Sequence, residues 1–151
     1  MKVGVDMQRF VLDASVTLSW CFSNQQTDYT QEVLRNLHHA EALVPSIWIL
    51  EVSNVLLVAE RRNMLLPTAS SRFISLLDSL PIVEIASRRD AITSSIMNLA
   101  RTNNLTSYDA TYLELAIREG IPIATLDKPL HRAAEQIGVG VFFPVKNLRD
   151  Q

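Results

Sequence analysis

Short apolar segments alternate with longer amphipathic stretches along the whole chain, and this alternation restricts the fold more than any other feature of the sequence. The apolar segments are rich in Val, Ile, Leu and Phe, as strands buried on both faces of a parallel sheet should be. Strands separated by helices are typical of a parallel sheet with helices on both faces. We therefore predict an α/β fold, a three-layer α/β/α sandwich around a central parallel sheet. The predicted strands cover residues 9–12, 42–44, 82–85, 121–126 and 139–143.

Helical periodicity fills the gaps between these strands. No linker, charge run or internal repeat divides the 151 residues, so we predict a single domain over residues 1–151, with residues 1–8 as a flexible N-terminal extension. The predicted helices cover residues 15–22, 28–40, 46–62, 68–80, 90–102, 108–119 and 130–137.

Composition and charge exclude several classes of protein. The single Cys21 rules out an internal disulfide and a cysteine-based zinc cluster, which indicates a reducing, cytoplasmic setting. No apolar run approaches the roughly 18 residues of a membrane span, because Glu51 interrupts the longest one. The net charge of −2 is not that of a strongly basic nucleic-acid binder. However, 11 of the 14 basic residues are Arg, which favours bidentate contacts with phosphates or carboxylates.

Two acidic residues follow predicted strands at their carboxyl ends. Asp13 comes directly after the first strand, and Asp127 ends the segment Ile123-Ala124-Thr125-Leu126-Asp127. Ligand sites in open parallel sheets form beyond the carboxyl ends of the strands. Asp is also a common N-cap residue, so helix capping explains each of these acids equally well when it is taken alone.

Two further acids lie on helices, among apolar residues. On helix 46–62, at about 100° per residue, Val55 and Val58 lie within about 40° of Glu51, which predicts that Glu51 is centred on the apolar stripe. A buried carboxylate must be compensated, and a salt bridge to an Arg in the core would do this for structural reasons alone.

Asp109 repeats this pattern on helix 108–119. Leu113 and Ala116 lie on its side of the helix, whereas Glu114 and Arg118 mark the opposite face, which we predict to be solvated. An acid in the first turn of a helix also complements the helix dipole. That benefit does not require burial, so the dipole leaves the position of Asp109 on the apolar stripe unexplained.

Convergence of these four acids would cause severe repulsion unless a cation were bound. Carboxylate oxygens without His or Cys select hard ions, so we expect one or two Mg²⁺ or Mn²⁺ ions. Such a centre suits hydrolysis of a phosphodiester, because the ion activates water and neutralises the leaving oxygen. Outside the four acids, 14 basic and 12 acidic residues remain, a net charge of +2 that mildly favours a polyanion. The predicted ligands are Asp13, Glu51, Asp109 and Asp127.

Each of the four acids lies in a short motif, and the motifs occur in a fixed order along the chain. They are Val11-Leu12-Asp13-Ala14-Ser15-Val16 with Trp20 following, Pro45 through Glu51-Val52-Ser53-Asn54-Val55-Leu56, Leu105-Thr106-Ser107-Tyr108-Asp109-Ala110-Thr111-Tyr112-Leu113, and Ala124-Thr125-Leu126-Asp127. In this order and spacing the chain resembles the PIN-domain ribonucleases, and within them the toxins of VapBC-type toxin–antitoxin pairs. The resemblance covers nearly the whole chain.

The resemblance implies a parallel α/β/α sandwich with an acidic Mg²⁺ or Mn²⁺ pocket, and an endoribonuclease that acts on RNA. It implies three kinds of partner: the RNA substrate, a second copy in a homodimer, and an antitoxin protein that lays a peptide across the groove. No membrane is involved. The ligand acids of the family correspond to Asp13, Glu51, Asp109 and Asp127. Its supporting polar residues correspond to Ser15, Asn54, Ser107 and Thr125.

Two other functions remain open. A receiver-like signalling module also arranges acids around Mg²⁺, but it would need a second acid after the first strand, where this chain has Ala14. It would also need a Lys after a late strand, whereas Lys128 adjoins an acid. The other possibility is a catalytically inactive PIN scaffold with a degenerate site, against which the complete set of acids argues. A dinucleotide-binding function is excluded, because no Gly-rich loop follows the first strand.

Overall fold

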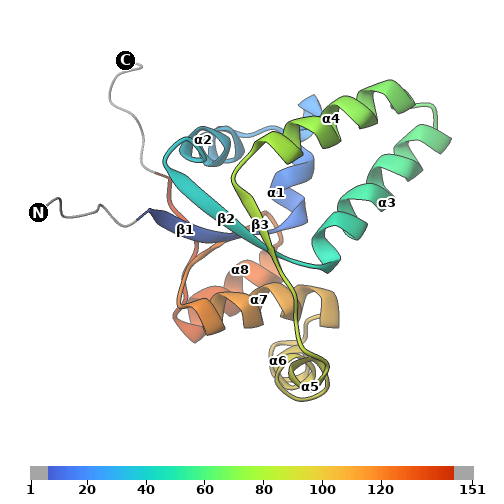
Figure 1. Ribbon diagram of the computed structural model, residues 1–151. Coiled ribbons are helices and arrows are strands. Elements are labelled where there is room, and N and C mark those ends of the chain that lie inside the picture. Colours follow the sequence, from blue (N-terminus) through green and yellow to red (C-terminus); the bar gives the residue numbers. More distant parts are fainter. Residues whose placement is uncertain (1–6, 145–151) are drawn as a thin grey trace, which may run out of the picture.

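The computed structural model describes residues 7–144 and has a parallel four-stranded sheet at its centre (Figure 1). The strands lie in the order β3-β2-β1-β4, and every pair is parallel, so that Val11 has Leu43 on one side and Ile123 on the other. The carboxyl ends of all strands therefore meet at one edge of the sheet. The strands are β1 (Gln8–Leu12), β2 (Ala40–Pro45), β3 (Ile82–Ile85) and β4 (Ile123–Ala124).

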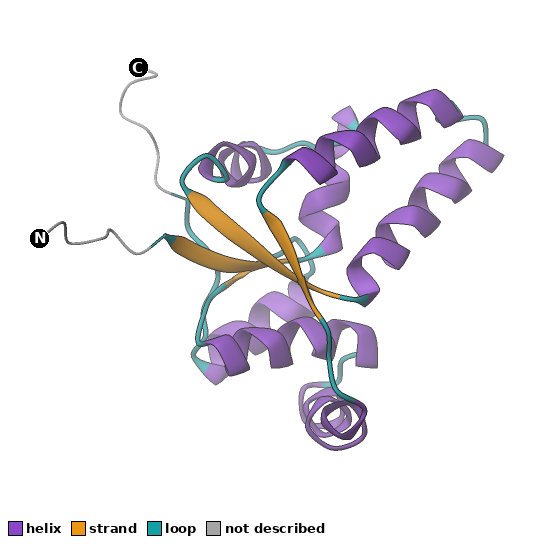
Figure 2. Cartoon of the chain, viewed as in Figure 1, coloured by secondary structure: helices purple, strands orange, loops and turns teal. Residues whose placement is uncertain are grey.

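Helices cover both faces of this sheet, which confirms the predicted three-layer α/β/α fold (Figure 2). Helices α1 and α2 lie on one face, and α7 and α8 lie on the other (Figure 1). None of the helices within residues 7–144 is long and apolar enough to cross a membrane. The helices are α1 (Ala14–Ser19), α2 (Asp28–Asn36), α3 (Ile47–Arg61), α4 (Pro67–Ser79), α5 (Arg89–Ala91), α6 (Met97–Asn103), α7 (Ser107–Glu119) and α8 (Lys128–Ile137), with a 3₁₀ turn η1 (Ser23–Gln25) and a π-helical segment η2 (Ile92–Ile96).

Helices α3 and α4 run antiparallel and extend away from the sheet as an arm (Figure 1). Pro67 is the first residue of α4, where its missing N–H costs nothing. The chain then returns through β3 to the sheet, and α5, η2 and α6 follow one another below it (Figure 1). This path places the start of α3 and the start of α7 near the carboxyl edge of the sheet, where the candidate site lies.

The structure differs from the sequence prediction at the last two strands and at the N-terminus. Strand β4 is only Ile123–Ala124, because Pro122 has no N–H to pair and the chain after Ala124 turns towards α8. Predicted strand 139–143 is reduced to one parallel bridge between Val141 and Ile123. Gly138 and Gly140 flank its start with φ of 92° and 78°, which is incompatible with a straight strand. Of the predicted extension 1–8, residues 1–6 lie outside the described residues, and Gln8 already pairs in β1.

A stacked aromatic pair attaches the C-terminal segment to the core. The rings of Phe10 and Phe142 lie 4.1 Å apart between centroids with an interplanar angle of 13°, and both side chains are buried. The hydroxyl of Tyr29 donates a hydrogen bond to the carbonyl oxygen of Phe142 at 2.9 Å. Burial raises the pKa of Tyr29 to about 12, so this hydroxyl stays a donor near neutral pH. Three distant segments of the chain are thus fixed together.

This packing predicts that substitution of Phe142 destabilises the protein strongly, whereas substitution of its neighbour Phe143 does not. We expect Phe142→Ala to lower the free energy of unfolding by about 3–5 kcal/mol, because it removes a buried, stacked ring and leaves a cavity. The matched control is Phe143→Ala, since the side chain of Phe143 is 77% exposed. The control should change stability by less than about 0.5 kcal/mol. Urea denaturation followed by circular dichroism measures both. Equal losses for the two variants would contradict this account of the core.

Candidate active site

Four acidic side chains from different parts of the chain lie at the carboxyl edge of the sheet. Asp13 follows the last residue of β1, and Asp127 lies three positions after the end of β4. Glu51 lies in the second turn of α3, and Asp109 lies in the first turn of α7. The parallel sheet brings the strand ends together, and the two helices begin beside them. We refer to these four residues as the acidic cluster.

Asp13 is the most buried member of the acidic cluster, with 5% of its surface exposed. It occupies the N-cap position of α1, but its side chain does not cap that helix. Instead, Oδ2 accepts hydrogen bonds from the hydroxyls of Ser15 and Thr125, the latter at 2.8 Å. Burial raises the pKa of Asp13, the two hydroxyl hydrogen bonds lower it, and the negative charges of Asp109 and Asp127 raise it further.

The two hydroxyls that contact Asp13 are themselves held by the backbone. Oγ of Ser15 accepts a hydrogen bond from the N–H of Leu126, and Oγ1 of Thr125 accepts one from the N–H of Asp127, both at 3.0 Å. Each hydroxyl has a single proton, and in both cases it is directed at Asp13. The turn between β4 and α8 therefore orients a carboxylate at the end of β1. This network fixes Asp13 as a hydrogen-bond acceptor.

Glu51 is half-buried and is held by a tyrosine from α7. The hydroxyl of Tyr112 donates a hydrogen bond to Oε1 of Glu51 at 2.7 Å. Burial, followed by the charge of Asp13, raises the pKa of Tyr112, so its hydroxyl stays protonated. Burial also raises the pKa of Glu51, the hydrogen bond from Tyr112 lowers it, and the charges of Asp13 and Asp109 raise it. The carboxylate is thus oriented, but it is not neutralised.

Asp109 and Asp127 both belong to helix N-termini. The backbone N–H of Asp109 donates to Oγ1 of Thr106, the N-cap of α7, at 3.1 Å. Burial raises the pKa of Asp109, the charge of Asp127 raises it further, and a side-chain hydrogen bond with Thr106 lowers it. Oδ1 of Asp127 accepts from the N–H of Leu130 at 2.9 Å and so caps α8. Helix capping therefore explains the position of Asp127, through one of its two oxygens, but it does not explain the position of Asp13, whose side chain does not cap α1.

Among the described residues, no basic side chain pairs with the negative charge of the acidic cluster. The ion pairs within residues 7–144 involve other acids, namely Glu32, Asp90, Glu114, Glu119 and Glu135. Within these residues, no Arg forms an ion pair with Glu51, so the alternative of a salt bridge in the core is not observed. Instead, the charges of Asp13, Asp109 and Asp127 each raise the pKa of at least one other member of the acidic cluster.

The donor atoms of the acidic cluster fit a hard divalent cation by type and by charge, because they are carboxylate oxygens in mutual repulsion. Within residues 7–144, no group of three or more His, Cys, Asp or Glu side chains is arranged to hold a metal ion. Repulsion between like charges opposes a closer approach of the carboxylates, and a bound cation would offset it.

Two details of the predicted helix faces are wrong. Glu51 does not lie at the centre of the apolar stripe of α3, because Val55 is exposed and Glu51 lies at the margin of the buried face. Helix α3 has Leu and Val on several sides, so its sequence does not define one face. The residues that are buried on α3 are Trp48, Val52, Leu56 and Ala59.

The second error concerns Glu114 on α7, which we predicted on the solvated face. Its side chain is buried, with 8% of the residue exposed, and its carboxylate pairs with Arg118 at 3.2 Å. An ion pair one helical turn apart compensates the burial of this acid. Glu114 is therefore a buried carboxylate neutralised by an Arg, whereas the members of the acidic cluster have no such partner among the described residues.

The four predicted supporting residues fall into two groups. Ser15 and Thr125 contact Asp13 directly. Asn54 is exposed on α3, and within the described residues its side chain makes no hydrogen bond. Ser107 begins α7, and its side chain lines a neighbouring pocket rather than contacting an acid of the cluster. The structure thus brings two of the four residues to the acidic cluster.

Sequence reasoning missed two residues of the site. Tyr112 lies in the motif around Asp109, but nothing in the spacing predicts its hydrogen bond to Glu51, which is 61 positions away. Thr106 lies three residues before Asp109, and this T-x-x-D pattern resembles a capping box, which was a usable signal for the start of α7.

Comparison with known proteins identifies the family. The model of the PIN domain family matches residues 10–136, most of the chain, so this chain belongs to the PIN domain family, whose members are generally nucleases. A crystal structure of PAE2754 from Pyrobaculum aerophilum is similar in fold, with a TM-score of 0.67 and 21% sequence identity, covering 92% of this chain and 86% of that one. Comparison with curated proteins found no match.

Repulsion in the acidic cluster predicts that removing one charge stabilises the metal-free protein. Because the folded state raises the pKa of Asp109, ionisation of this residue costs stability, and the cost is complete only above the raised pKa. In a buffer that contains a chelator, at about pH 7, we expect Asp109→Asn to raise the unfolding midpoint by about 2 °C. The expected shift is small because solvent screens the charge of this half-buried residue. At about pH 3, Asp109 is mostly protonated in both the folded and the unfolded protein, so the gain in the unfolding midpoint should vanish.

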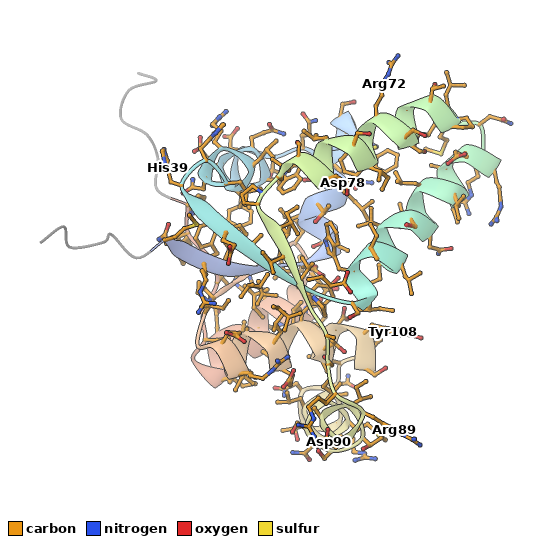
Figure 3. The ribbon with its side chains drawn as sticks, in the orientation of Figure 1. His39, Arg72, Asp78, Arg89, Asp90 and Tyr108 are labelled. Atoms are coloured by element: carbon orange, nitrogen blue, oxygen red, sulfur yellow. The ribbon has the colours of Figure 1, made fainter. Side chains whose placement is uncertain are left out.

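The control for this prediction is Asp78→Asn, which changes an exposed Asp on α4 (labelled in Figure 3) that does not affect the pKa of Asp13, Glu51 or Asp109. Differential scanning fluorimetry over the same pH series measures both variants. A lower midpoint for Asp109→Asn at neutral pH, with Asp78→Asn unchanged, would show that Asp109 stabilises the fold instead of opposing it.

Proposed function

We propose that this protein is a metal-dependent endoribonuclease that hydrolyses phosphodiester bonds in RNA. The observation that supports the proposal is the acidic cluster, which lies at the carboxyl edge of the sheet without a basic partner. Membership of the PIN domain family supports the reaction class. A cluster that only stabilised the fold would be expected to contain an Arg or Lys, as the pair of Glu114 and Arg118 does.

Asp13, Glu51, Asp109 and Asp127 would hold one or two Mg²⁺ or Mn²⁺ ions, directly or through water. When bound, such an ion lowers the pKa of water and neutralises charge on the leaving oxygen. The protein itself supplies the fixed position of Asp13, which comes from Ser15 and Thr125. Oriented carboxylates of this kind avoid reorganisation during the reaction.

The raised pKa values of Asp13, Glu51 and Asp109 also suit proton transfer. A general base works best when its pKa lies near the operating pH. Burial and repulsion shift Asp13, Glu51 and Asp109 in that direction. Tyr112 occupies Oε1 of Glu51 and leaves Oε2 without a hydrogen bond from the described residues. We assign Tyr112 the role of a positioning residue that sets the orientation of this carboxylate.

We also propose that the protein is the cytoplasmic toxin of a VapBC-type pair, a homodimer inhibited by an antitoxin. The α3–α4 arm supports protein partners, because it exposes Leu57, Met64 and Leu66. A groove of about 440 Å³ lies between the two helices, with Leu56 and Ile74 among its lining residues. Exposed apolar grooves of this kind bind amphipathic segments of other proteins.

Substitutions in the acidic cluster test the nuclease activity. We expect Asp13→Asn and Asp109→Asn to reduce Mg²⁺-dependent cleavage of a mixed RNA pool by more than about 100-fold, because each removes a charged ligand. Both variants should keep the circular dichroism spectrum of the folded protein. Asp78→Asn serves as the matched control and should cleave like the wild type.

Cleavage that is unchanged in both variants would overturn the mechanism. Absence of cleavage and of metal binding in the wild type would favour the inactive scaffold instead. A stable acyl phosphate on Asp13 after incubation with a small phosphodonor would favour the receiver-like alternative, which has a different fold family.

The toxin role is tested in cells. Expression of this chain alone should arrest growth, and co-expression with the small open reading frame beside its gene should relieve the arrest. The Asp13→Asn variant is the control and should not arrest growth at the same expression level. Normal growth with active nuclease would refute the toxin role and would leave the nuclease function in place.

A further inference from the structure

An apolar pocket lies beside the acidic cluster and is not used by the proposed mechanism. Its volume is about 320 Å³, at the lower end of the range for small-molecule sites. Its apolar lining comes from the start of α3, from η2 and from the start of α7. These residues are Ile47, Leu50, Ile92, Ile96 and Tyr108. We call this the side pocket.

The side pocket and the acidic cluster share two walls. Leu50 of the side pocket is adjacent in sequence to Glu51, and Tyr108 is adjacent to Asp109. Successive residues of a helix point about 100° apart, so α3 and α7 each present an acid to one space and an apolar side chain to the next. The side pocket therefore lies next to Glu51 along α3 and next to Asp109 along α7.

The side pocket also offers hydroxyl groups. Ser46, Ser87 and Thr111 are part of its lining. Oγ of Ser87 is buried and has no hydrogen-bond partner among the described residues. A buried hydroxyl without a partner costs free energy, which a ligand with donors and acceptors on its edge would recover. The lining is therefore that of a site for a flat, largely apolar group with polar edges.

The charge outside the side pocket favours a polyanion. Arg88 and Arg89 follow Ser87 directly, and both are exposed. Arg88 pairs with Asp90 at 3.3 Å. Figure 3 shows the side chains of Arg89 and Tyr108 projecting to the same side of the molecule. The four carboxylates of the acidic cluster repel an RNA strand, so part of its binding free energy must come from neighbouring groups such as these.

We propose that the side pocket binds one nucleobase of the RNA strand next to the bond that is cleaved, with the ring of Tyr108 stacked on the base. This inference rests on the proposed nuclease function. Tyr108 is 58% exposed, so its ring face is available to a base. Single-stranded RNA is recognised by unstacked bases that lie on aromatic side chains, and every base has a face that can stack.

Binding tests the side pocket independently of cleavage. The probe is a short oligouridylate that carries one 2-aminopurine, whose fluorescence is quenched on stacking. We expect quenching by the wild type and by Tyr108→Phe, which keeps the ring. Tyr108→Ala should bind about tenfold more weakly and should not quench. Leu50→Ala should weaken binding, whereas its control Leu76→Ala, an exposed leucine of α4 outside both the side pocket and the groove of the arm, should bind like the wild type.

Cleavage provides a second test. Abasic nucleotides are placed one at a time along an RNA that the wild type cleaves. At one position next to the cleaved bond, kcat/KM of the wild type should fall about tenfold. The same abasic RNA should cause no further loss in Tyr108→Ala, because that variant no longer uses the base. Equal losses in both proteins would overturn the proposal.

The outcomes separate the two proposals. Quenching that depends on Tyr108 in a protein that does not cleave RNA would support the side pocket and refute the nuclease. Cleavage by the wild type with identical RNA binding by Tyr108→Ala would refute the side pocket alone. Conversion of a dimer to a monomer by Leu50→Ala in sedimentation velocity, together with absence of quenching, would show that a second copy covers this face and would also refute it.

Discussion

Uncompensated negative charge at the carboxyl edge of the sheet is the constraint on which the rest of the structure depends. Asp13 is nearly fully buried, and the protein stabilises its charged form with two hydroxyls, not with a cation. Those hydroxyls are fixed by the N–H groups of Leu126 and Asp127. The arrangement fixes the position of Asp13 and leaves its charge without a basic partner among the described residues. The folded state accepts repulsion here, and under the proposed function this charge would hold the ion that acts on the phosphodiester.

Periodicity and parallel topology together made the fold predictable from the sequence. The strand at 9–12 and the helix at 46–62 were each found to within one residue, because a short apolar run and a 3.6-residue repeat are local signals. The end of the chain was not predictable in this way. The predicted strand at 139–143 does not form because of two glycines with positive φ, and the pattern of apolar residues does not contain that information.

The site was predictable only as a set of residues. The sequence pointed to Asp13 and Asp127 in the same way. In the structure, however, Asp13 accepts hydrogen bonds from two hydroxyls, whereas Asp127 caps a helix. Which of these occurs depends on contacts over more than a hundred positions, such as that of Asp13 with Thr125. The side pocket is likewise assembled from three distant segments. Its position against the acidic cluster suggests that one pair of helices sets both the chemistry and the choice of substrate.

Metal binding measured by calorimetry tests the central claim most directly. Mn²⁺ is titrated into the wild type and into Asp13→Asn, in two buffers that differ in ionisation enthalpy. We predict saturable binding that is lost in the variant, and a release of protons on binding, because a cation lowers the raised pKa values of Asp13 and Glu51. Binding of equal strength in Asp13→Asn, or no binding to the wild type, would contradict the claim that these carboxylates form a metal centre.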